Sequence, residues 1–205
     1  GFATDQGAII GLEYRFALFS NLQLGIHRSL ISKTIMTFGR WDAVAQGDRS
    51  PVGVSLTVSY EGINNLRDRY IPAAAVTVSR TFSNWVAVYA TPGSAEKTHA
   101  ADTIEGHDPS HTGPDEHAGH SDTWFAGIGA RVRFRPSAYV VAEYTPRIAG
   151  YDPNPGVWGI AVEKLTGGHT LQLNFGNSFG TTYGQIARGG IADVVLLGFN
   201  ITRKF

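Results

Sequence analysis

The stretch VGVSLTVSYE, residues 52–61, alternates between apolar and polar side chains at every position. This period of two predicts a β-strand, because successive side chains of a strand point to opposite faces. One face would carry apolar side chains, namely Val52, Val54, Leu56, Val58 and Tyr60. The other face would carry small or polar residues, namely Gly53, Ser55, Thr57, Ser59 and Glu61. We therefore expect a sheet with one apolar and one polar surface.

The same alternation recurs in HTLQLNFGN (169–177) and WFAGIGARVRFR (124–135), which indicates an all-β chain. Applied along the sequence, it predicts eleven strands, over residues 7–18, 22–28, 33–45, 51–61, 70–81, 84–92, 123–135, 138–146, 157–166, 169–177 and 192–205. With 205 residues, the chain suits a single domain over residues 1–205.

The composition removes several classes of function. Lys+Arg and Asp+Glu are equal at 17 each, so no global charge favours nucleic acid as a partner. The chain has no cysteine, which excludes a disulfide framework and a thiolate metal site. No apolar run approaches the roughly 18 residues of a membrane-spanning helix.

Two all-β architectures fit the alternation: a secreted sandwich that buries its apolar face, and a membrane barrel that turns this face to lipid. Many predicted strands reach ten residues, the length that crosses a bilayer when tilted. Charges on the polar faces can also pair across strands, Arg131 with Glu143 and Glu13 with His27. An enclosed lumen needs such pairing, because buried charges must be neutralised.

The connections also favour the membrane barrel. Short links (19–21, 46–50, 82–84, 136–137 and 167–168) alternate with a second set that holds the long ones (29–32, 62–69, 93–122, 147–156 and 178–191). Transmembrane barrels combine tight periplasmic turns with longer outside loops, and nearly always have an even number of strands. We therefore expect an antiparallel up-and-down transmembrane β-barrel of about 12 strands, with one upward strand before Gly1 and both termini periplasmic.

Aromatic residues should form two girdles at the membrane interfaces. The outer girdle would contain Tyr60, Tyr70, Tyr89, Trp124, Tyr144 and Trp158. The periplasmic girdle would contain Phe16, Trp41, Trp85, Phe134 and Phe205.

The tail DVVLLGFNITRKF (193–205) resembles the C-terminal strand of Gram-negative outer-membrane proteins, with a terminal Phe205 and alternating apolar residues, although Arg203 departs from that pattern. With GLEYRF, NNLRDRY, ARVRFRPSAYVVAEYTPR, GYDP, LQLNFGNSFGTTYGQIARGG and LGFNITRKF, the chain resembles a bacterial family of outer-membrane β-barrels of unknown function, over most of its length except 93–122. The resemblance implies an outer-membrane location, contact with outer-membrane lipid, and recognition of the last strand by the barrel-assembly machinery. It also points to periplasmic or surface subunits, such as c-type cytochromes, as partners.

The lumen is one candidate site. Charged side chains expected to line it are Glu13, Arg15, His27, Glu61, Arg131, Arg133, Arg135, Glu143, Glu163 and Lys204. They could form a solute path with a basic stripe or fill a narrow lumen with salt bridges, since a 12-strand barrel lies between filled barrels and open porins. The glycine-rich stretch GNSFGTTYGQIARGG (176–190) would fold into or over the barrel mouth as a constriction.

The long outside loop over 93–122 is a second candidate site. It is rich in His, Asp and Glu, and His107, His111, His117 and His120, with Asp115 and Glu116 assisting, could bind Zn or Cu. The alternative is a solvated loop whose composition is under little constraint. Other cofactors are not expected.

We expect no enzyme and no catalytic residue, since neither G-x-S-x-G nor H-E-x-x-H occurs and no GK[ST] ends a glycine-rich loop. The expected function is a small porin-like channel or a membrane scaffold for partner subunits. Alternatives are a surface metal-binding barrel and a membrane anchor for a c-type cytochrome or another multi-subunit complex.

Overall fold

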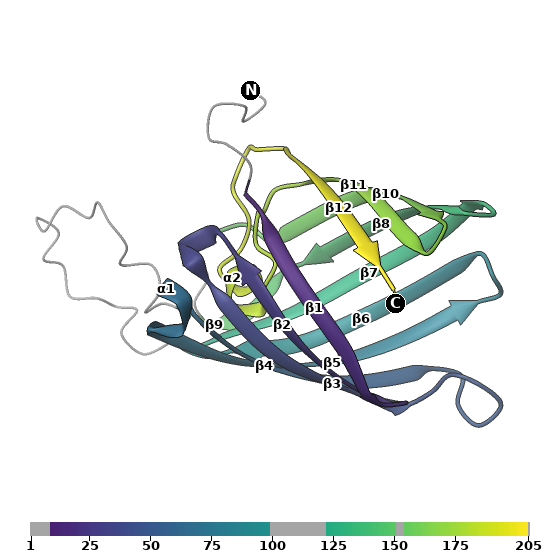
Figure 1. Cartoon of the computed structure of the whole chain (residues 1–205), viewed down its shortest axis with the longest axis horizontal. Coiled ribbons are helices and arrows are strands. Elements are labelled where there is room, and N and C mark those ends of the chain that lie inside the picture. The colour runs from purple at the N-terminus through teal and green to yellow at the C-terminus, as the bar shows by residue number, and fades with distance from the viewer. Residues whose placement is uncertain (1–8, 99–121, 151–153, 205) are drawn as a thin grey trace, which may run out of the picture.

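The computed structural model describes residues 9–98, 122–150 and 154–204. In these ranges the chain forms one twelve-stranded antiparallel sheet that curls into an open barrel (Figure 1). Its strands are β1 (Gly11–Phe19), β2 (Leu22–Ser29), β3 (Ile35–Val44), β4 (Gly53–Gly62), β5 (Asp68–Phe82), β6 (Val86–Ala95), β7 (Thr123–Arg135), β8 (Ala138–Thr145), β9 (Arg147–Gly150), β10 (Val157–Thr166), β11 (His169–Gly176) and β12 (Leu196–Arg203). Except for β9, each strand pairs with its neighbours in chain order, so the predicted up-and-down antiparallel arrangement is confirmed.

Helical segments are short. They are η1 (Ile31–Lys33), α1 (Ile63–Leu66) and α2 (Tyr183–Ala187). Among the residues that the structure describes, no helix has the length and hydropathy to cross a membrane.

Most strand boundaries differ from the sequence prediction by a few residues, and three differences are larger or change the loops. Strand β9 continues the line of β8 along β7, beyond Pro146, which has no N–H to donate to the ladder. Strand β6 extends to Ala95, so residues 93–95 belong to the sheet and not to the loop predicted over 93–122. Strand β12 begins only at Leu196, four residues later than predicted.

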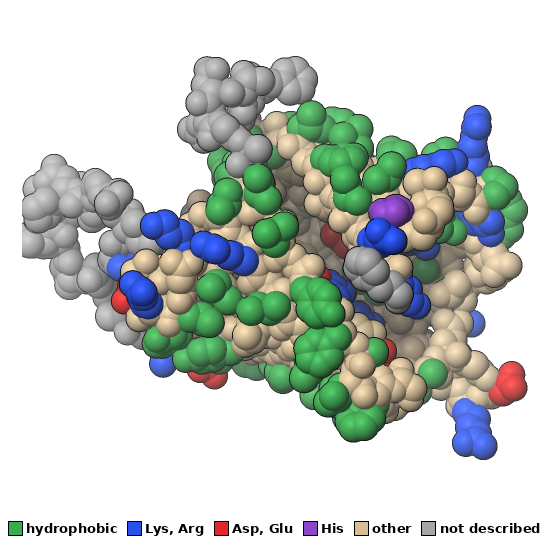
Figure 2. Space-filling view, viewed as in Figure 1, with side chains coloured by type: hydrophobic (Ala, Val, Ile, Leu, Met, Phe, Trp, Pro, Cys, Tyr) green, Lys and Arg blue, Asp and Glu red, His purple; other side chains and the backbone are tan. Residues whose placement is uncertain are grey.

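The barrel is apolar outside and polar inside. On β4, Val58 is 51% exposed whereas its neighbour Ser59 is 8% exposed. Figure 2 shows hydrophobic side chains spread over the outer surface, with charged side chains in the hollow between β1 and β12. A soluble sandwich would bury the apolar face, so the alternation of residues 52–61 is that of a membrane barrel.

Inside the barrel, aromatic rings lie over glycines of the neighbouring strand. The register places Gly25 opposite Phe38, Gly93 opposite Phe125 and Gly129 opposite Tyr89. A Cβ atom added to any of these glycines would collide with the facing ring. Aromatic–glycine pairs of this kind help to pin the register of a sheet. The three glycines therefore let bulky residues lie flat against the inner wall.

The two ends of the barrel differ. At one end, which we call the short-turn end, lie the connections at 20–21, 45–52, 83–85, 136–137 and 167–168. The opposite, long-loop end carries η1, α1, β9 and the connection that contains α2 (Figure 1). The predicted alternation of connections is thus confirmed.

The sheet is not closed among the described residues. Strands β1 and β12 form its two edges and do not pair with each other. Both run from the long-loop end to the short-turn end (Figure 1), so an antiparallel closure takes one further strand between them. The odd number of strands predicted from the sequence, eleven, likewise called for one additional strand.

Candidate functional site

The first part of the connection between β11 and β12, residues 177–190, folds into the long-loop half of the barrel (Figure 1), and we call it the inner segment. It contains α2, which begins after Thr182, whose hydroxyl accepts a hydrogen bond from the N–H of Gln185 at 3.2 Å. A threonine cap of this type satisfies a backbone donor at the start of a helix. The glycine-rich stretch 176–190 thus folds into the barrel mouth, as predicted.

The base of the inner segment is tied to the wall by Asn177. Its side-chain oxygen accepts from the N–H of Trp158 at 2.8 Å, and its amide donates to the carbonyl of Gly156 at 2.9 Å. At the other end of the segment, the N–H of Gly190 donates to the carbonyl of Pro155 at 2.8 Å. The segment is therefore anchored to the β8–β10 connection before and after α2.

A buried carboxylate fixes α2 against β4. Glu61 is 1% exposed, and its carboxylate accepts from the N–H of Gly184 at 3.2 Å. A Cβ at position 184 would collide with that carboxylate, so glycine allows the close approach. Arg188, just after α2, supplies a positive charge that acts on Glu61. A buried charge requires such compensation.

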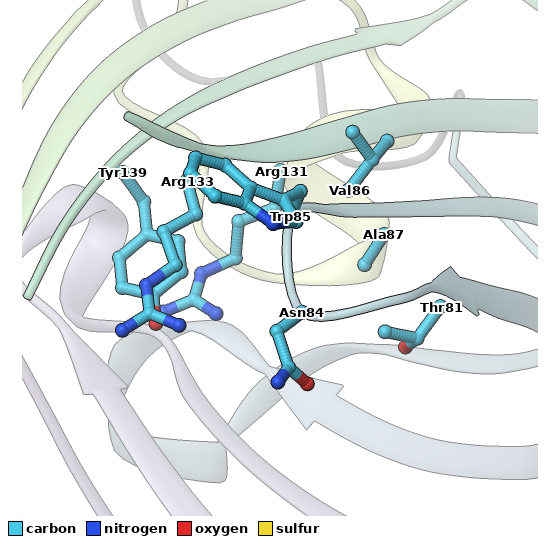
Figure 3. Close-up of a pocket in the computed structure, with 8 residues that line it drawn as sticks. All are labelled: Thr81, Asn84, Trp85, Val86, Ala87, Arg131, Arg133 and Tyr139. Carbon is cyan, nitrogen blue, oxygen red and sulfur yellow. The ribbon is translucent and has the colours of Figure 1, made fainter. Parts of the chain in front are cut away.

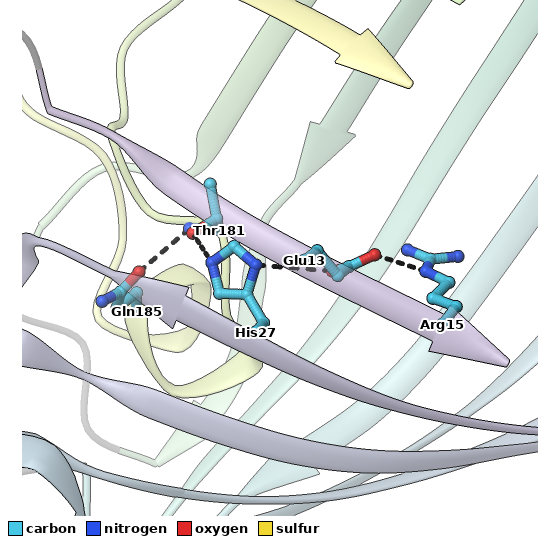
Figure 4. A network of polar contacts seen from close by, with 5 residues as sticks. All are labelled: Glu13, Arg15, His27, Thr181 and Gln185. Carbon is cyan, nitrogen blue, oxygen red and sulfur yellow. Dashed lines mark hydrogen bonds and ion pairs between the residues drawn. The ribbon is translucent and has the colours of Figure 1, made fainter. Parts of the chain in front are cut away.

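A second polar network joins the inner segment to β1 and β2 (Figure 4). His27 is 5% exposed, and its Nε2 lies 2.8 Å from the hydroxyl of Thr181. Its Nδ1 lies 3.5 Å from Glu13, which in turn pairs with Arg15. The N–H of Thr181 donates to the side-chain oxygen of Gln185 at 3.0 Å, which connects this network to α2. The register places Glu13 opposite His27, as the sequence predicted.

The other side of α2 packs on apolar residues of the wall. The ring of Tyr183 stacks on Phe125 of β7 with the centroids 5.9 Å apart. Ala187 lies in the same buried cluster as Ile71 and Ala75 of β5. Helix α2 thus contacts β5, β6 and β7, while polar contacts hold the segment to β1, β2 and β4. The inner segment therefore spans the lumen from wall to wall.

The ion pairing of the short-turn half differs from the prediction in one pair. Arg131 faces Val141, not Glu143, because the turn is only Pro136–Ser137 and the ladder shifts between Arg133 and Arg135. The offset is two residues, so Arg131 still points inward, where it pairs with Glu163. Glu143 accepts a hydrogen bond from the hydroxyl of Tyr89.

Two of the remaining charges predicted for the lumen, Arg133 and Arg135, follow Arg131 on the inward alternation of β7. Lys204 lies one residue beyond the end of β12 and is exposed. A further inward pair, Arg40 with Asp42 on β3 at 3.0 Å, was missed by the sequence reading. The apolar neighbours of these two residues obscured the alternation of that strand.

One predicted girdle residue is placed wrongly. Tyr89 points into the barrel over Gly129 and does not face outward. The other girdle residues described at the long-loop end are on the outer surface, where Tyr60 and Tyr70 stack at 5.4 Å and Trp124, Tyr144 and Trp158 are exposed or half-buried. At the short-turn end, the predicted girdle residues Phe16, Trp41, Trp85 and Phe134 are exposed. Phe205 lies outside the described residues.

The candidate metal ligands His107, His111, His117 and His120, with Asp115 and Glu116, also lie outside the described residues. Within the described ranges, no group of three or more His, Cys, Asp or Glu side chains is arranged to hold a metal ion.

A cavity of about 220 Å³ opens in the short-turn half (Figure 3). It is lined by the strand ends and the turn between β5 and β6, with the residues Thr81, Asn84, Trp85, Val86, Ala87, Arg131, Arg133 and Tyr139. The described interior thus combines an occupied long-loop half with an arginine-lined cavity in the other half.

No curated protein and no solved structure matches the chain. A family described as a membrane bound beta barrel domain (DUF5777) matches residues 1–205, the whole length. Together with the exposed apolar face of the sheet, this match shows that the chain belongs to this family of membrane-bound β-barrel domains.

Proposed function

We propose that this barrel is a membrane scaffold of the outer membrane, closed when alone, that holds partner subunits at its ends. The observation that carries the proposal is the inner segment, which is hydrogen-bonded to His27 on one side of the lumen and stacked on Phe125 on the other. Displacing a segment that is held by buried polar contacts on several strands costs free energy, because each broken contact leaves a buried group without a partner.

The orientation follows the general design of bacterial barrels. The short-turn end would face the periplasm and the long-loop end the outside. The terminal strand would be read by the barrel-assembly machinery, and soluble subunits, among them c-type cytochromes, are the partners that the scaffold would hold. The barrel carries no catalytic role in this proposal.

Conductance tests the closed state. The purified chain should give no steady current in planar bilayers, whereas a variant in which residues 180–188 are replaced by a short Gly-Ser linker should conduct. A deletion of similar length within 99–121 serves as the control and should stay silent. Steady current from the unmodified chain would contradict the proposal, as would a native pull-down from outer membranes that recovers the barrel without any soluble subunit.

A small channel is the second candidate. The arginine-lined cavity favours it, because it leaves space in the short-turn half of the lumen. In this case the inner segment would act as a gate, and wild-type current would appear as brief openings whose frequency rises when contacts of Glu61 with α2 are removed.

A further inference from the structure

The cavity at the short-turn end places two guanidinium groups side by side on the inner wall. In Figure 3 the side chains of Arg131 and Arg133 point to the same side as the amide of Asn84, with Trp85 on the other side of the group. The lining contains no carboxylate. We propose that this cavity is a binding site for a small anion that carries a phosphate or carboxylate group.

The charges of the side chains around the cavity favour an anion as its ligand. Arg131 is neutralised by Glu163 and held in place over the ring of Tyr139, 3.5 Å from its centroid. Arg133 has no carboxylate partner among the described residues, and it donates only to the carbonyls of Arg135 at 3.3 Å and Pro136 at 2.6 Å. Carbonyl oxygens orient a guanidinium without cancelling its charge. One net positive charge therefore remains beside the cavity.

The geometry supports a phosphate or carboxylate in particular. A guanidinium has five N–H donors in a rigid fork that matches these two groups. Arg133 uses two nitrogen atoms on carbonyls and has further N–H groups to offer. Asn84 adds an amide from the turn before β6. A recess with walls of low dielectric strengthens the attraction of one sign of charge.

The floor of the site is fixed by the neighbouring loop. The side chain of Gln46 donates to the carbonyl of Thr81 at 2.9 Å and accepts from its N–H at 2.8 Å. The 45–52 connection is thus tied to the end of β5, which leads into the turn that carries Asn84 and Trp85. The N–H of Arg133 also donates to the backbone carbonyl of Trp85 at 2.7 Å. The backbone of this turn is therefore held before any ligand binds, which lowers the entropy that binding must lose.

Two sources of the same chemistry fit the cavity: a free small anion in the aqueous compartment, and the phosphate headgroup of a lipid at the rim. Trp85 is 62% exposed at that rim, so both have access. Because Trp85 lines the cavity, its fluorescence should report occupation by either.

The test titrates the full chain, folded in zwitterionic vesicles, with inorganic phosphate and with succinate. We expect a saturable change in fluorescence that a Trp85→Phe variant lacks, and a dissociation constant that rises with ionic strength. Arg133→Gln should weaken binding at least about tenfold, because it removes a charged hydrogen-bond donor from the site. Arg133→Lys should retain part of the affinity because the charge remains.

Arg135→Gln is the matched control, because Arg135 is the next inward position on β7 and does not line the cavity. It should bind like the unmodified chain. Repeating the titration with phosphatidylglycerol in the vesicles distinguishes the sources: weaker phosphate binding that depends on Arg133 assigns the site to the lipid headgroup, and unchanged binding assigns it to the free anion. Absence of a saturable signal, or equal affinities for Arg133→Gln and the unmodified chain in material that migrates as folded, would overturn the proposal.

Discussion

Leu173→Arg tests which face of the sheet meets lipid. Leu173 lies near the middle of β11, between Val162 of β10 and Phe199 of β12. All three side chains are exposed on the outer surface, so together they form part of an apolar band. An arginine on the lipid face costs roughly 2–4 kcal/mol near the bilayer midplane and about 0–1 kcal/mol near the interfaces. Because Leu173 is central in its strand, we expect a loss of about 2–4 kcal/mol in the free energy of unfolding.

The adjacent position provides the control. Asn174 points inward, where its partners across the ladder are Ala161 and Gly198, and Gly198 leaves room beside it. Asn174→Arg should therefore cost much less than Leu173→Arg. The measurement is a reversible denaturant titration of the barrel in lipid vesicles, followed by tryptophan fluorescence. Equal losses for the two variants would refute the assignment of inner and outer faces.

Three further predictions concern the interior and the long loop. A double-mutant cycle on Arg131 and Glu163 should give a coupling of about 0.5–3 kcal/mol, whereas the same cycle on Arg131 and Glu143 should give a value near zero; the reverse result would restore the register predicted from sequence. Gly184→Leu should push α2 away from its carboxylate partner and raise the frequency of channel openings in planar bilayers, and unchanged silence would show that α2 does not close the lumen. Zinc titrations should reveal weak, micromolar binding only when residues 99–119 are present, and identical isotherms with and without them would remove the metal hypothesis.

The strand pattern could be predicted because it is local. Each membrane-spanning strand repeats its alternation over eight or more residues, so a boundary error of a few residues leaves the inward set unchanged. His27 illustrates this: its parity placed it inside, and its burial confirms that direction. Its position opposite Glu13 followed from a turn at residues 19–21, and the register confirms this pairing as well. The side of the sheet to which each residue points is therefore the property that such a sequence predicts best.

Register could not be predicted to the same degree, because it depends on turn length and bulges. The pairing of Arg131 was displaced by two residues through a shorter turn and a ladder shift that leave no mark in the alternation. Tyr89 was assigned to the girdle for being aromatic near a strand end. The sequence did contain an indication that its side chain points inward, because the residue opposite it in the ladder is an inward-facing glycine, Gly129.

The contacts of the inner segment depend on the whole fold. Composition indicated that a glycine-rich stretch would enter the mouth, yet Gln185 meets Thr34 and Gly184 meets Glu61 across more than a hundred residues of sequence. Contacts of such separation exist only after the barrel has brought its strands together. No local pattern could have supplied them.

The size of the wall side chains explains why the inner segment is there. A barrel of about eight strands can be filled by its own side chains, whereas a wider one leaves free space. In the long-loop half several inward positions of β4 and β5 are small, namely Thr57, Ser59, Ala73 and Ala75. They leave a volume that strand residues do not occupy, and α2 occupies it with Tyr183 and Gln185. In the short-turn half, Arg131, Arg133 and Tyr139 reach into the lumen from the wall itself, so no inserted segment is required there. The proposed closure and the proposed anion site thus lie in opposite halves of the same interior, so separate mutations can test each of them.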